Sequence, residues 1–523
     1  MGVASDLYAH ARTATGLPDD DFRRAAALVG LAVAVLVLLA AMRSSKKAKN
    51  ANEPPVVPYS LPIIGSALEY GKDPVNFLLA NQAKYGECFT LILGGQKATF
   101  FLGPDGNHFL FNVPLANASA EGVYRTLTVP VFGAEVVYDV ENAVFMEQKK
   151  FVKDALNTTA FRSYVPMIWE ETVNFLKEWK ENPGTLNIFE EMSELTIRTA
   201  ARCLLGKEVR SQLHSNVAKL YHDLDAGLAP INLVFRWLPL PAYINRDRAH
   251  KIMTDLFTRI LRERRANNDT NNQDLMQTLM NSRYRDGSVM SENAIAHLMI
   301  ATLMGGQHTS STTVSWILFE LSRRPDVVAQ LLEEQSKVLT GKPDTPVDQL
   351  PAFDYEQLRE FAFLDCVMKE TLRLHPPIHT VMRKVTKPLN YKGFHIAEGT
   401  LICGAASVSQ VDPARFPNPT KFEPSRFINN DEGAGEWTIG GVDIAQKSAR
   451  SHFLPFGAGR HRCIGEAFAY TQIKTIVSII LRKYSVKLPI SPKTGEPVFP
   501  KPDYTSLIVL PQKPAELVVT PRA

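Results

Sequence analysis

The sequence lacks both the charge imbalance and the cysteine pattern that several classes of protein need. Its 58 basic and 54 acidic residues leave a formal net charge of only +4, and no basic block is interleaved with aromatic residues. These features argue against nucleic-acid binding, which needs a basic surface. The five cysteines are odd in number and scattered without a CxxC pair, which argues against a disulfide framework or structural zinc site and favours a reducing compartment.

Other architectural signals are also missing. No GxGxxG motif follows a strand, so the chain offers no dinucleotide site of its own. There is no internal repeat or long low-complexity linker, only a Gly-rich polar loop at 429–443. Length alone would suggest about three domains, but the pattern predicts one large, mainly helical unit. The few strand-like stretches are 88–93, 98–102, 389–396 and 506–511.

Long hydrophobic runs are rare, with one exception near the start of the chain. Residues 25–42 are uncharged and mostly apolar, which is just enough for a short transmembrane helix. Four cations follow this run and two precede it, which favours a cytosolic body and a lumenal tail at 1–24. The alternative is a cleaved signal peptide, but the run begins late, after three aspartates, and lacks a clean cleavage site.

The stretch after this anchor, 43–65, is basic and then rich in proline, which predicts a stiff hinge before a body at 66–523. Three glycosylation sequons begin at Asn117, Asn157 and Asn268. They would be accessible only if the body were lumenal, so attached glycans would overturn the expected orientation.

The segment FLPFGAGRHRCIG at 453–465 gives Cys463 an unusual setting. Nearby glycines allow close backbone approach, and Arg460, His461 and Arg462 supply positive potential that favours a thiolate. The following segment, 466–484, has helical apolar spacing, so Cys463 should lie at a helix N-terminus. Such a thiolate is either a nucleophile, with His461 as a candidate base, or a ligand of haem iron.

This segment resembles the haem-binding loop of the cytochrome P-450 superfamily, in which Phe, Gly, Cys and Gly recur at the spacing of Phe456, Gly459, Cys463 and Gly465. The resemblance implies a haem-thiolate fold, mainly α with small β-sheets, that binds haem b. Cys463 would be the axial ligand of the iron, with Phe456 and Gly457 beside the cofactor. His461 stands where most members carry arginine, and it is a candidate propionate partner.

A second motif, ETLRLHPP, places Glu370 and Arg373 on one helical face. The ExxR spacing alone is weak evidence, because it recurs at Glu320, Glu356 and Glu423. The flanking RLHPP and the later PTKFEPSRF, which contains Arg426, distinguish this copy. The resemblance implies that Glu370, Arg373 and Arg426 form a structural ion-pair triad on the proximal side of the haem.

Ser291 as an N-cap and Pro325 as a stop predict a helix of about 33 residues, roughly 50 Å long. Its middle holds two glycines and five hydroxyl residues at 309–313, which are poor helix formers. One interpretation is a small-residue surface for tight packing, and the other is a locally opened helix beside a ligand. GGQHTS resembles the superfamily's oxygen-activation stretch, which implies that Thr309 helps to deliver protons.

His308 takes the place of the usual acidic residue before this threonine and can carry protons near neutral pH. Histidine here, together with the stretch 124–151, is typical of the sterol 14α-demethylases, and the overall pattern resembles their fungal form. This resemblance, which spans about 54–515, implies a set of haem-propionate partners: Tyr124, Tyr138, Lys149, Arg383 and His461. Without it, Tyr138 would be a core residue and Lys149 a solvated charge.

The same resemblance implies a long, rigid, apolar substrate, lanosterol or 24-methylenedihydrolanosterol. Its 14α-methyl group would leave as formate after three oxidations that consume NADPH and O2, a step of ergosterol biosynthesis. The implied walls, each of which could equally be ordinary core, are Leu127, Phe132, Val136, Leu228, Phe235, Met304, Gly305, His379 and Leu507.

The implied partners are a separate NADPH-cytochrome P-450 reductase, docking near Arg460 and Arg462, the endoplasmic-reticulum membrane, and azole inhibitors. Two alternatives remain at this point. One is a P-450 that oxidises another lipid or a foreign compound, and the other is a non-catalytic haem- or sterol-binding sensor.

Overall fold

The computed structural model describes residues 52–522, apart from residue 63 and residues 182–183, 207–208, 211–215, 229–240, 268–273, 429–437, 440–441 and 444–448. The expected tail and anchor, part of the hinge, Phe235 and Asn268 therefore lie outside the described residues. Within the described ranges, no helix has the length and apolar character needed to cross a membrane.

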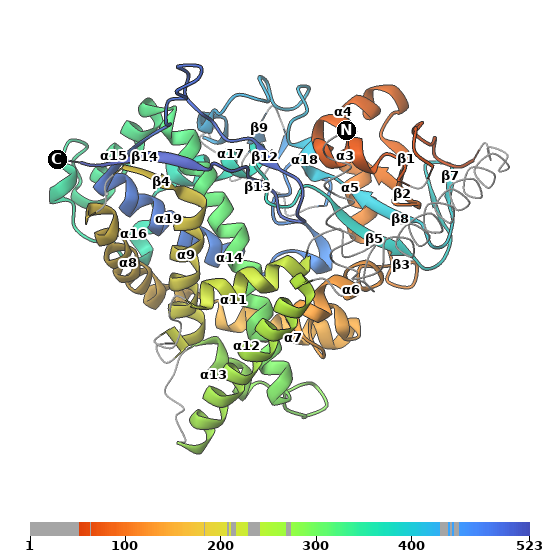
Figure 1. Ribbon diagram of the computed structural model, residues 1–523, viewed down its shortest axis with the longest axis horizontal. Helices are drawn as coiled ribbons and strands as arrows, with labels where there is room; N and C mark the ends of the chain where they lie inside the picture. Colours follow the sequence, from red (N-terminus) through yellow and green to blue (C-terminus); the bar gives the residue numbers. More distant parts are fainter. Residues whose placement is uncertain are drawn as a thin grey trace, which may run out of the picture.

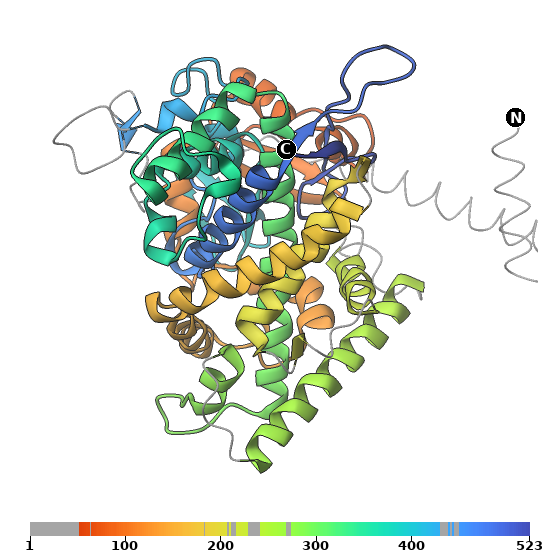
Figure 2. The same ribbon diagram turned by 90° about the vertical axis from the view of Figure 1, so that its left-hand side faces the viewer.

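Helices dominate the described chain, and the longest, α14 (Glu292–Ser322), runs through its centre (Figures 1 and 2). The helices before it are α3 (Ala67–Lys72), α4 (Pro74–Tyr85), α5 (Gly103–Asn112), α6 (Glu121–Phe132), α7 (Asn142–Ala155), α8 (Thr158–Glu181), α9 (Ile188–Ala200), α11 (Asn216–Asp225), α12 (Pro241–Ala266) and α13 (Leu275–Asn281). After it come α15 (Pro325–Thr340), α16 (Tyr355–Arg359), α17 (Ala362–Leu374), α18 (Ala406–Ser409) and α19 (Glu466–Lys483). Short 3-10 or π turns are η1 (Val137–Asp139), η2 (Ala201–Leu205), η3 (Ala226–Leu228), η5 (Val347–Gln349), η6 (Pro424–Phe427) and η7 (Gly459–His461).

The strands form small sheets at the edges of this helical body. The largest has the order β1 (Cys88–Leu93), β2 (Gln96–Phe101), β8 (Leu401–Gly404), β5 (Val381–Val385) and β3 (Ala118–Ser119). A second sheet has the order β11 (Tyr484–Lys487), β14 (Glu516–Pro521) and β4 (Gly184–Asn187). Three two-stranded pairs remain: β6 (Leu389–Tyr391) with β7 (Phe394–Ile396), β9 (Thr438–Ile439) with β10 (Val442–Asp443), and β12 (Pro502–Asp503) with β13 (Leu510–Pro511).

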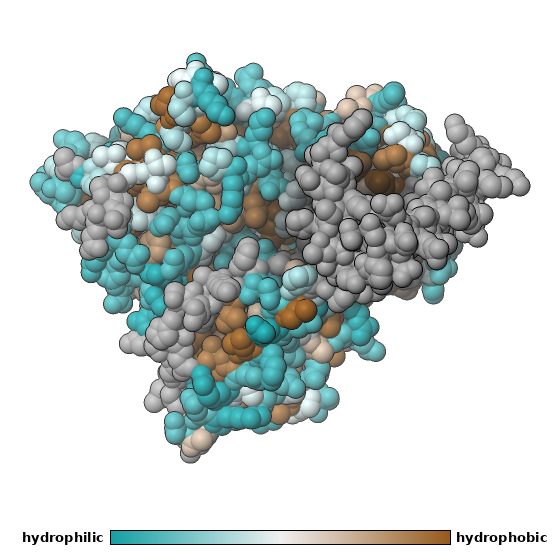
Figure 3. Space-filling model, in the orientation of Figure 1, coloured by the Kyte–Doolittle hydropathy of each residue, from teal (hydrophilic) through white to brown (hydrophobic). Residues whose placement is uncertain are grey.

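The main hydrophobic core lies around α14, which packs against α9, α12, α17 and α19. Smaller clusters cover the two faces of the five-stranded sheet. The face shown in Figure 3 is largely hydrophilic where residues are described, with hydrophobic side chains in scattered patches. This arrangement confirms the mainly helical class with small sheets.

Several local expectations are confirmed, and two are wrong. Ser291 caps α14 by accepting a hydrogen bond from the Ala294 N–H, and α19 begins at Glu466 as its spacing predicts. Residues 506–511 do not form a full strand, because the partner β12 offers only two residues and β13 is confined to Leu510–Pro511. The local opening of the central helix is also not seen, since α14 runs without interruption past its glycines.

Candidate functional site

The loop that carries Cys463 is held in one shape by its own backbone and by α5. The Cys463 N–H donates to the Phe456 carbonyl at 3.0 Å, which closes the loop just before α19. Gly459 has a φ of +63°, and a Cβ there would lie 2.7 Å from the Phe111 carbonyl oxygen. Only glycine fits this position without moving the backbone. Sequence and packing together therefore fix where the thiol stands.

Cys463 differs from the other four cysteines, which are buried, because it is exposed. Protein atoms around the thiol nevertheless disfavour its charged form and raise its pKa, whereas the Gly465 N–H, Lys149 and Arg462 act in the opposite direction. The position directly before the N-terminus of α19 also favours an anion. A coordinated metal ion deprotonates a thiol outright, so these donors suit a thiolate ligand.

Lys149 on α7 lies beneath this loop. Its ammonium group donates to the carbonyl oxygens of Arg460 and Arg462, both at 2.6 Å. Burial lowers its pKa, and the Cys463 side chain raises it. The structure therefore places Lys149 against the backbone of the cysteine loop, where it orders that loop.

Four aromatic rings lie in series next to the same loop. Tyr124 and Tyr138 have ring centroids 5.2 Å apart, and Tyr138 and Phe145 lie 5.9 Å and 5.3 Å from the ring of His461. Tyr124 is fixed at its far end, where its hydroxyl oxygen accepts the Met382 N–H at 2.9 Å. Burial raises the pKa of both tyrosines, so their hydroxyl groups remain protonated.

Cationic groups border this aromatic series. Arg383 is buried, and one of its nitrogens donates to the Met382 carbonyl at 2.8 Å. Burial, and next the Arg383 cation, lower the pKa of His461 to about 4. Among the described residues, the buried Nε of Arg460 and the buried Nδ1 of His461 have no hydrogen-bond partner. The buried Arg460 Nε–H is an unsatisfied donor that calls for an acceptor, and His461 Nδ1 is a second one in the tautomer that carries its hydrogen there. A carboxylate is the strongest acceptor for a cationic donor.

The middle of α14 faces open space. Gly305 is exposed within a helix that is otherwise largely buried, and a Cβ at Gly305 or Gly306 would meet no described atom within 4 Å. The Thr309 hydroxyl lies one turn later and donates to the Gly305 carbonyl at 2.9 Å. This bond satisfies the hydroxyl while the helix stays intact.

His308 turns away from the exposed face and is buried. Its Nε2 lies 3.3 Å from Oδ1 of Asp225, the last residue of α11. Neutral or charged, the imidazole is thus paired with a half-buried carboxylate on a neighbouring helix. Sequence reasoning did not find Asp225, because nothing in the sequence links α11 to α14.

The expected apolar walls come from several elements. Leu127, Val136 and Met304 are buried, while Phe132, Leu228 and Leu507 are half-buried. His379 donates to or accepts from the Thr380 hydroxyl at 2.9 Å, and burial lowers its pKa to about 4, so it is neutral. It lines a cavity of about 30 Å³, which is large enough to hold water.

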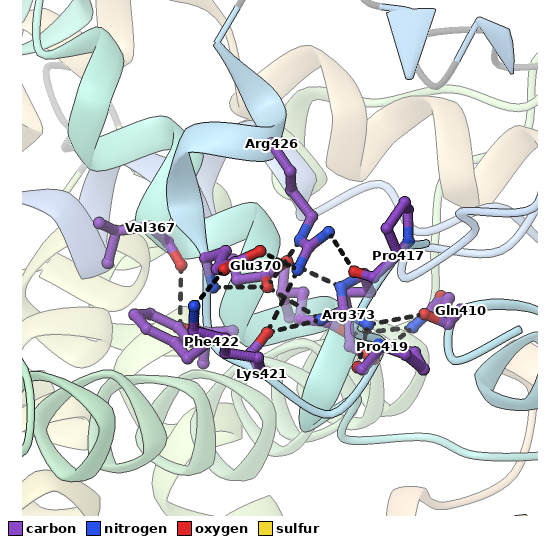
Figure 4. Close-up of polar contacts among 12 residues, drawn as sticks. Val367, Glu370, Arg373, Gln410, Pro417, Pro419, Lys421, Phe422 and Arg426 are labelled. Carbon is purple, nitrogen blue, oxygen red and sulfur yellow. Dashed lines mark hydrogen bonds and ion pairs between the residues drawn. The ribbon is translucent and has the colours of Figure 1, made fainter. Parts of the chain in front are cut away.

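The residues of the ExxR motif form a fully buried ion-pair network (Figure 4). Arg373 donates to both carboxylate oxygens of Glu370, at 2.7 and 2.8 Å, and Arg426 donates to the same carboxylate at 2.9 Å. Arg373 also donates to the carbonyls of Gln410 and Pro419. Glu370 and Arg373 are completely inaccessible, so the network ties α17 to the loop before η6 rather than contacting a ligand.

These residues fit a haem group. A haem group needs a ligand for its iron, hydrogen-bond donors for its two carboxylates that are not already paired within the protein, and open space for its ring. The exposed Cys463, the partnerless Arg460 Nε and His461 Nδ1, and the open face at Gly305 provide these three features. Sequence reasoning named Cys463, His461 and Gly305, but it did not assign Arg460 to the cofactor; its place in the cationic run was the available signal.

Comparison with solved structures agrees with this geometry. A cyanobacterial protein determined with bound retinoic acid matches 90% of this chain and 99% of its own, with a TM-score of 0.74 and 20% sequence identity. At that identity the likeness concerns the fold alone.

Curated relatives are much more similar. The lanosterol 14-alpha demethylase of Cunninghamella elegans is 44% identical over 94% of this chain and 95% of its own length. That of Schizosaccharomyces pombe is 42% identical over 90% and 93%, and the eburicol 14-alpha-demethylase of Uncinula necator is 42% identical over 88% and 89%. The family model described as Cytochrome P450 matches residues 54–519. The chain belongs to the cytochrome P450 family.

Proposed function

We propose that this protein is a sterol 14α-demethylase. The observation that carries the proposal is the similarity, across nine-tenths of the chain, to relatives named for this activity on lanosterol or eburicol. The substrate would be lanosterol or 24-methylenedihydrolanosterol, as the resemblance in sequence implies. Its 14α-methyl group would be oxidised to an alcohol and an aldehyde and then released as formate, which leaves a ring double bond.

Cys463 would hold a haem through its sulfur, and the haem would supply the oxygen chemistry of all three oxidations. Arg460 and His461 offer buried donors to its carboxylates, and Arg383, Tyr124 and Tyr138 border the same place. Lys149 acts one step away, because it holds the loop carbonyls on both sides of His461. Each of these residues binds or orients; none reacts.

Proton supply falls to α14. The Thr309 hydroxyl lies on the turn that begins at the exposed Gly305, so it can exchange its bond to the Gly305 carbonyl for one to a reacting oxygen. His308, the adjacent residue, lies 3.3 Å from the Asp225 carboxylate. We assign Thr309 as the proton donor at the site and His308 as the group that passes protons inward from Asp225.

Binding of the sterol would be mostly apolar. Leu127, Val136 and Met304 are buried side chains on α6, the loop after it and α14, and Phe132 and Leu228 are half-buried and pack against the main core that contains Val136 and Met304. A rigid hydrocarbon skeleton gains binding energy from such walls in proportion to the area removed from water. His379, kept neutral by burial, adds no charge to this surface.

Electron delivery and membrane attachment belong to the same proposal. The chain has no dinucleotide motif after a strand, so an NADPH-dependent reductase would supply the electrons. The apolar run at 25–42 would anchor the protein in the endoplasmic-reticulum membrane, with the body cytosolic, where sterols partition. Azoles would inhibit it.

The test is reconstitution of the purified full chain with a fungal reductase, NADPH and either sterol. Mass spectrometry would measure the 14-demethylated sterol and formate. We expect product that is abolished in Cys463→Ala and strongly reduced in Thr309→Ala. A thiolate-type Soret band for the reduced carbon monoxide complex without any product would reject the sterol assignment and favour oxidation of another lipid, whereas no NADPH consumption with any substrate would favour a sensor.

A further inference from the structure

Two histidines from different helices lie next to the backbone at the end of α6. His250 belongs to α12 and His297 to α14, and their ring centroids lie 5.0 Å apart at an angle of 41°. His297 contacts Gly133 and Ala134, which lie in the chain between two expected sterol walls, Phe132 and Val136. The mechanism proposed above uses neither histidine.

Gly133 allows this close approach. Its φ is +97°, and a Cβ there would lie 2.3 Å from Cγ of His297 and 2.4 Å from Nδ1. The imidazole therefore lies directly on the Gly133 backbone, where a larger residue would collide with it. The Gly133 N–H remains in the helix and donates to the Val129 carbonyl at 2.9 Å.

The carbonyls on both sides of Gly133 are engaged. Nδ1 of His297 lies 2.8 Å from the Ala134 carbonyl oxygen, and because a carbonyl only accepts, Nδ1 carries the hydrogen. His250 interacts with the Phe132 carbonyl, while its Nε2 is buried and has no hydrogen-bond partner within the described chain. Burial and then the neighbouring His297 lower the pKa of His250, which keeps this ring neutral.

The turn of α6 just before this point is also packed tightly. A Cβ at Gly227 of η3 would lie 2.7 Å from Cγ2 of Val131 and 2.5 Å from Cδ of Arg246 on α12. α12, α14 and η3 thus converge on the last turn of α6. Phe132 is half-buried and follows Val131 directly, so its backbone is fixed on both sides.

We propose that His250 and His297 are positioning residues for the sterol, because together they fix the Phe132–Ala134 backbone and so set where Phe132 and Val136 stand in the substrate wall. The proposal rests on the proposed function, since it names the sterol as the ligand whose fit is controlled. It predicts that losing a histidine donor weakens sterol binding and loosens this segment without altering the thiolate site.

The variants separate the donor from the ring. His297→Phe keeps a ring on Gly133 but removes the donor to Ala134, His297→Asn keeps an amide donor close to the position of Nδ1, and His250→Phe removes the second contact. His395→Phe is the control, because His395 is exposed on the distant hairpin strand β7. All are made in the full haem-loaded protein.

Two readouts apply to each variant. Titration with lanosterol, followed by the shift of the Soret band, gives the sterol dissociation constant. Hydrogen–deuterium exchange of a peptide spanning 129–140, measured without sterol, reports how firmly the two histidines hold the Phe132–Ala134 backbone. We expect His297→Phe to weaken binding about 3- to 10-fold, as loss of one hydrogen bond implies. His250→Phe should weaken binding in the same direction. Both variants should exchange faster, with His297→Asn and His395→Phe close to the parent protein.

The proposal is overturned if both phenylalanine variants bind lanosterol as the parent does and exchange at the parent rate. If the parent protein itself gives no sterol-induced shift, the proposed function fails. The exchange measurement then still decides whether the two histidines hold the Phe132–Ala134 backbone. Should His297→Phe fail to give the thiolate-type carbon monoxide band, His250→Phe carries the same test.

Discussion

Nζ of Lys149 lies 2.6 Å from the backbone carbonyl oxygen of Arg462, the residue directly before Cys463. The same ammonium group reaches the Arg460 carbonyl, so one charge on α7 holds the peptide groups that lead to the exposed thiol. A lysine that sequence resemblance assigns to a haem carboxylate is thus bonded to the loop itself, and its removal should affect the loop first.

Lys149→Met should destabilise the cysteine loop. Two carbonyls lose a charged donor, and a hydrogen bond to a charged group contributes about 1.5–3 kcal/mol. We expect weaker haem retention, seen as a smaller thiolate-type band of the reduced carbon monoxide complex per mole of protein. Lys150→Met is the matched control, because Lys150 is exposed; equal bands in the two variants would contradict this role.

Glu370→Gln should lower the free energy of unfolding by about 3–5 kcal/mol, since it leaves Arg373 fully buried without a counter-charge, whereas Arg426 keeps its ion pair with Glu423. Urea denaturation measures the change. The control is Glu356→Gln, whose partner Arg162 is largely exposed and whose loss should cost less than about 1 kcal/mol. A similar small effect in both variants would show that the network does not hold α17 in place.

The ExxR copies explain what sequence could and could not predict here. Glu320 pairs with Arg323, and Glu423 with Arg426, so helical or turn spacing forms the pair at these copies as well as at Glu370. Only tertiary packing makes the Glu370 copy fully buried. Local periodicity likewise predicted α14, its Ser291 cap and α19, because these depend on neighbours in sequence.

Contacts between distant segments escaped prediction. The contacts of Asp225 with His308, of Gly133 with His297, and of Lys149 with the cysteine loop join residues that are 80 to more than 300 positions apart in the chain. No periodicity or motif encodes such pairs. The short strand β13 shows the opposite error. The local pattern predicted a strand at 506–511, but the strand that pairs with it, β12, has only two residues.

Glu334 should make stability depend on pH. Its carboxylate on α15 accepts the N–H groups of Phe363 and Leu364 in the first turn of α17, and burial raises its pKa to about 7. The folded state therefore binds the Glu334 proton more tightly than the unfolded state does. The resulting contribution to the free energy of unfolding is complete below about pH 4.5 and is lost as the pH rises through 7.

We therefore measure the free energy of unfolding by urea denaturation at pH 5 and at pH 8. Between these two pH values it should decrease by about 2 kcal/mol more in the parent protein than in Glu334→Gln. Glu333→Gln is the neighbouring control, because Glu333 is exposed and should leave the parent's pH dependence unchanged. Parallel pH curves for Glu334→Gln and the parent would show that Glu334 does not titrate in this range.

His308 and Asp225 should act as one unit in proton supply. Asp225→Asn and His308→Gln should each reduce formate produced per NADPH by about 10-fold or more, a low value for acid–base catalysis. Because the two side chains lie 3.3 Å apart, the double variant should lose little more than either single one. Asp223→Asn, on the same helix, is the control, and fully additive losses would separate the two residues.

Gly305 offers a test in which stability and binding move in opposite directions. A Cβ there meets no described atom within 4 Å, so Gly305→Ala should raise the free energy of unfolding by about 1 kcal/mol, the helix preference of alanine over glycine. Gly305→Phe would place a ring in the space beside Thr309 and should abolish the lanosterol-induced Soret shift while the protein still folds. Gly306→Ala, also facing open space, should match the stability gain of Gly305→Ala. If Gly305→Phe bound lanosterol as tightly as the parent, the sterol would have to lie elsewhere than along this turn of α14, and the assignment of Met304 and Gly305 to its reacting end would fail.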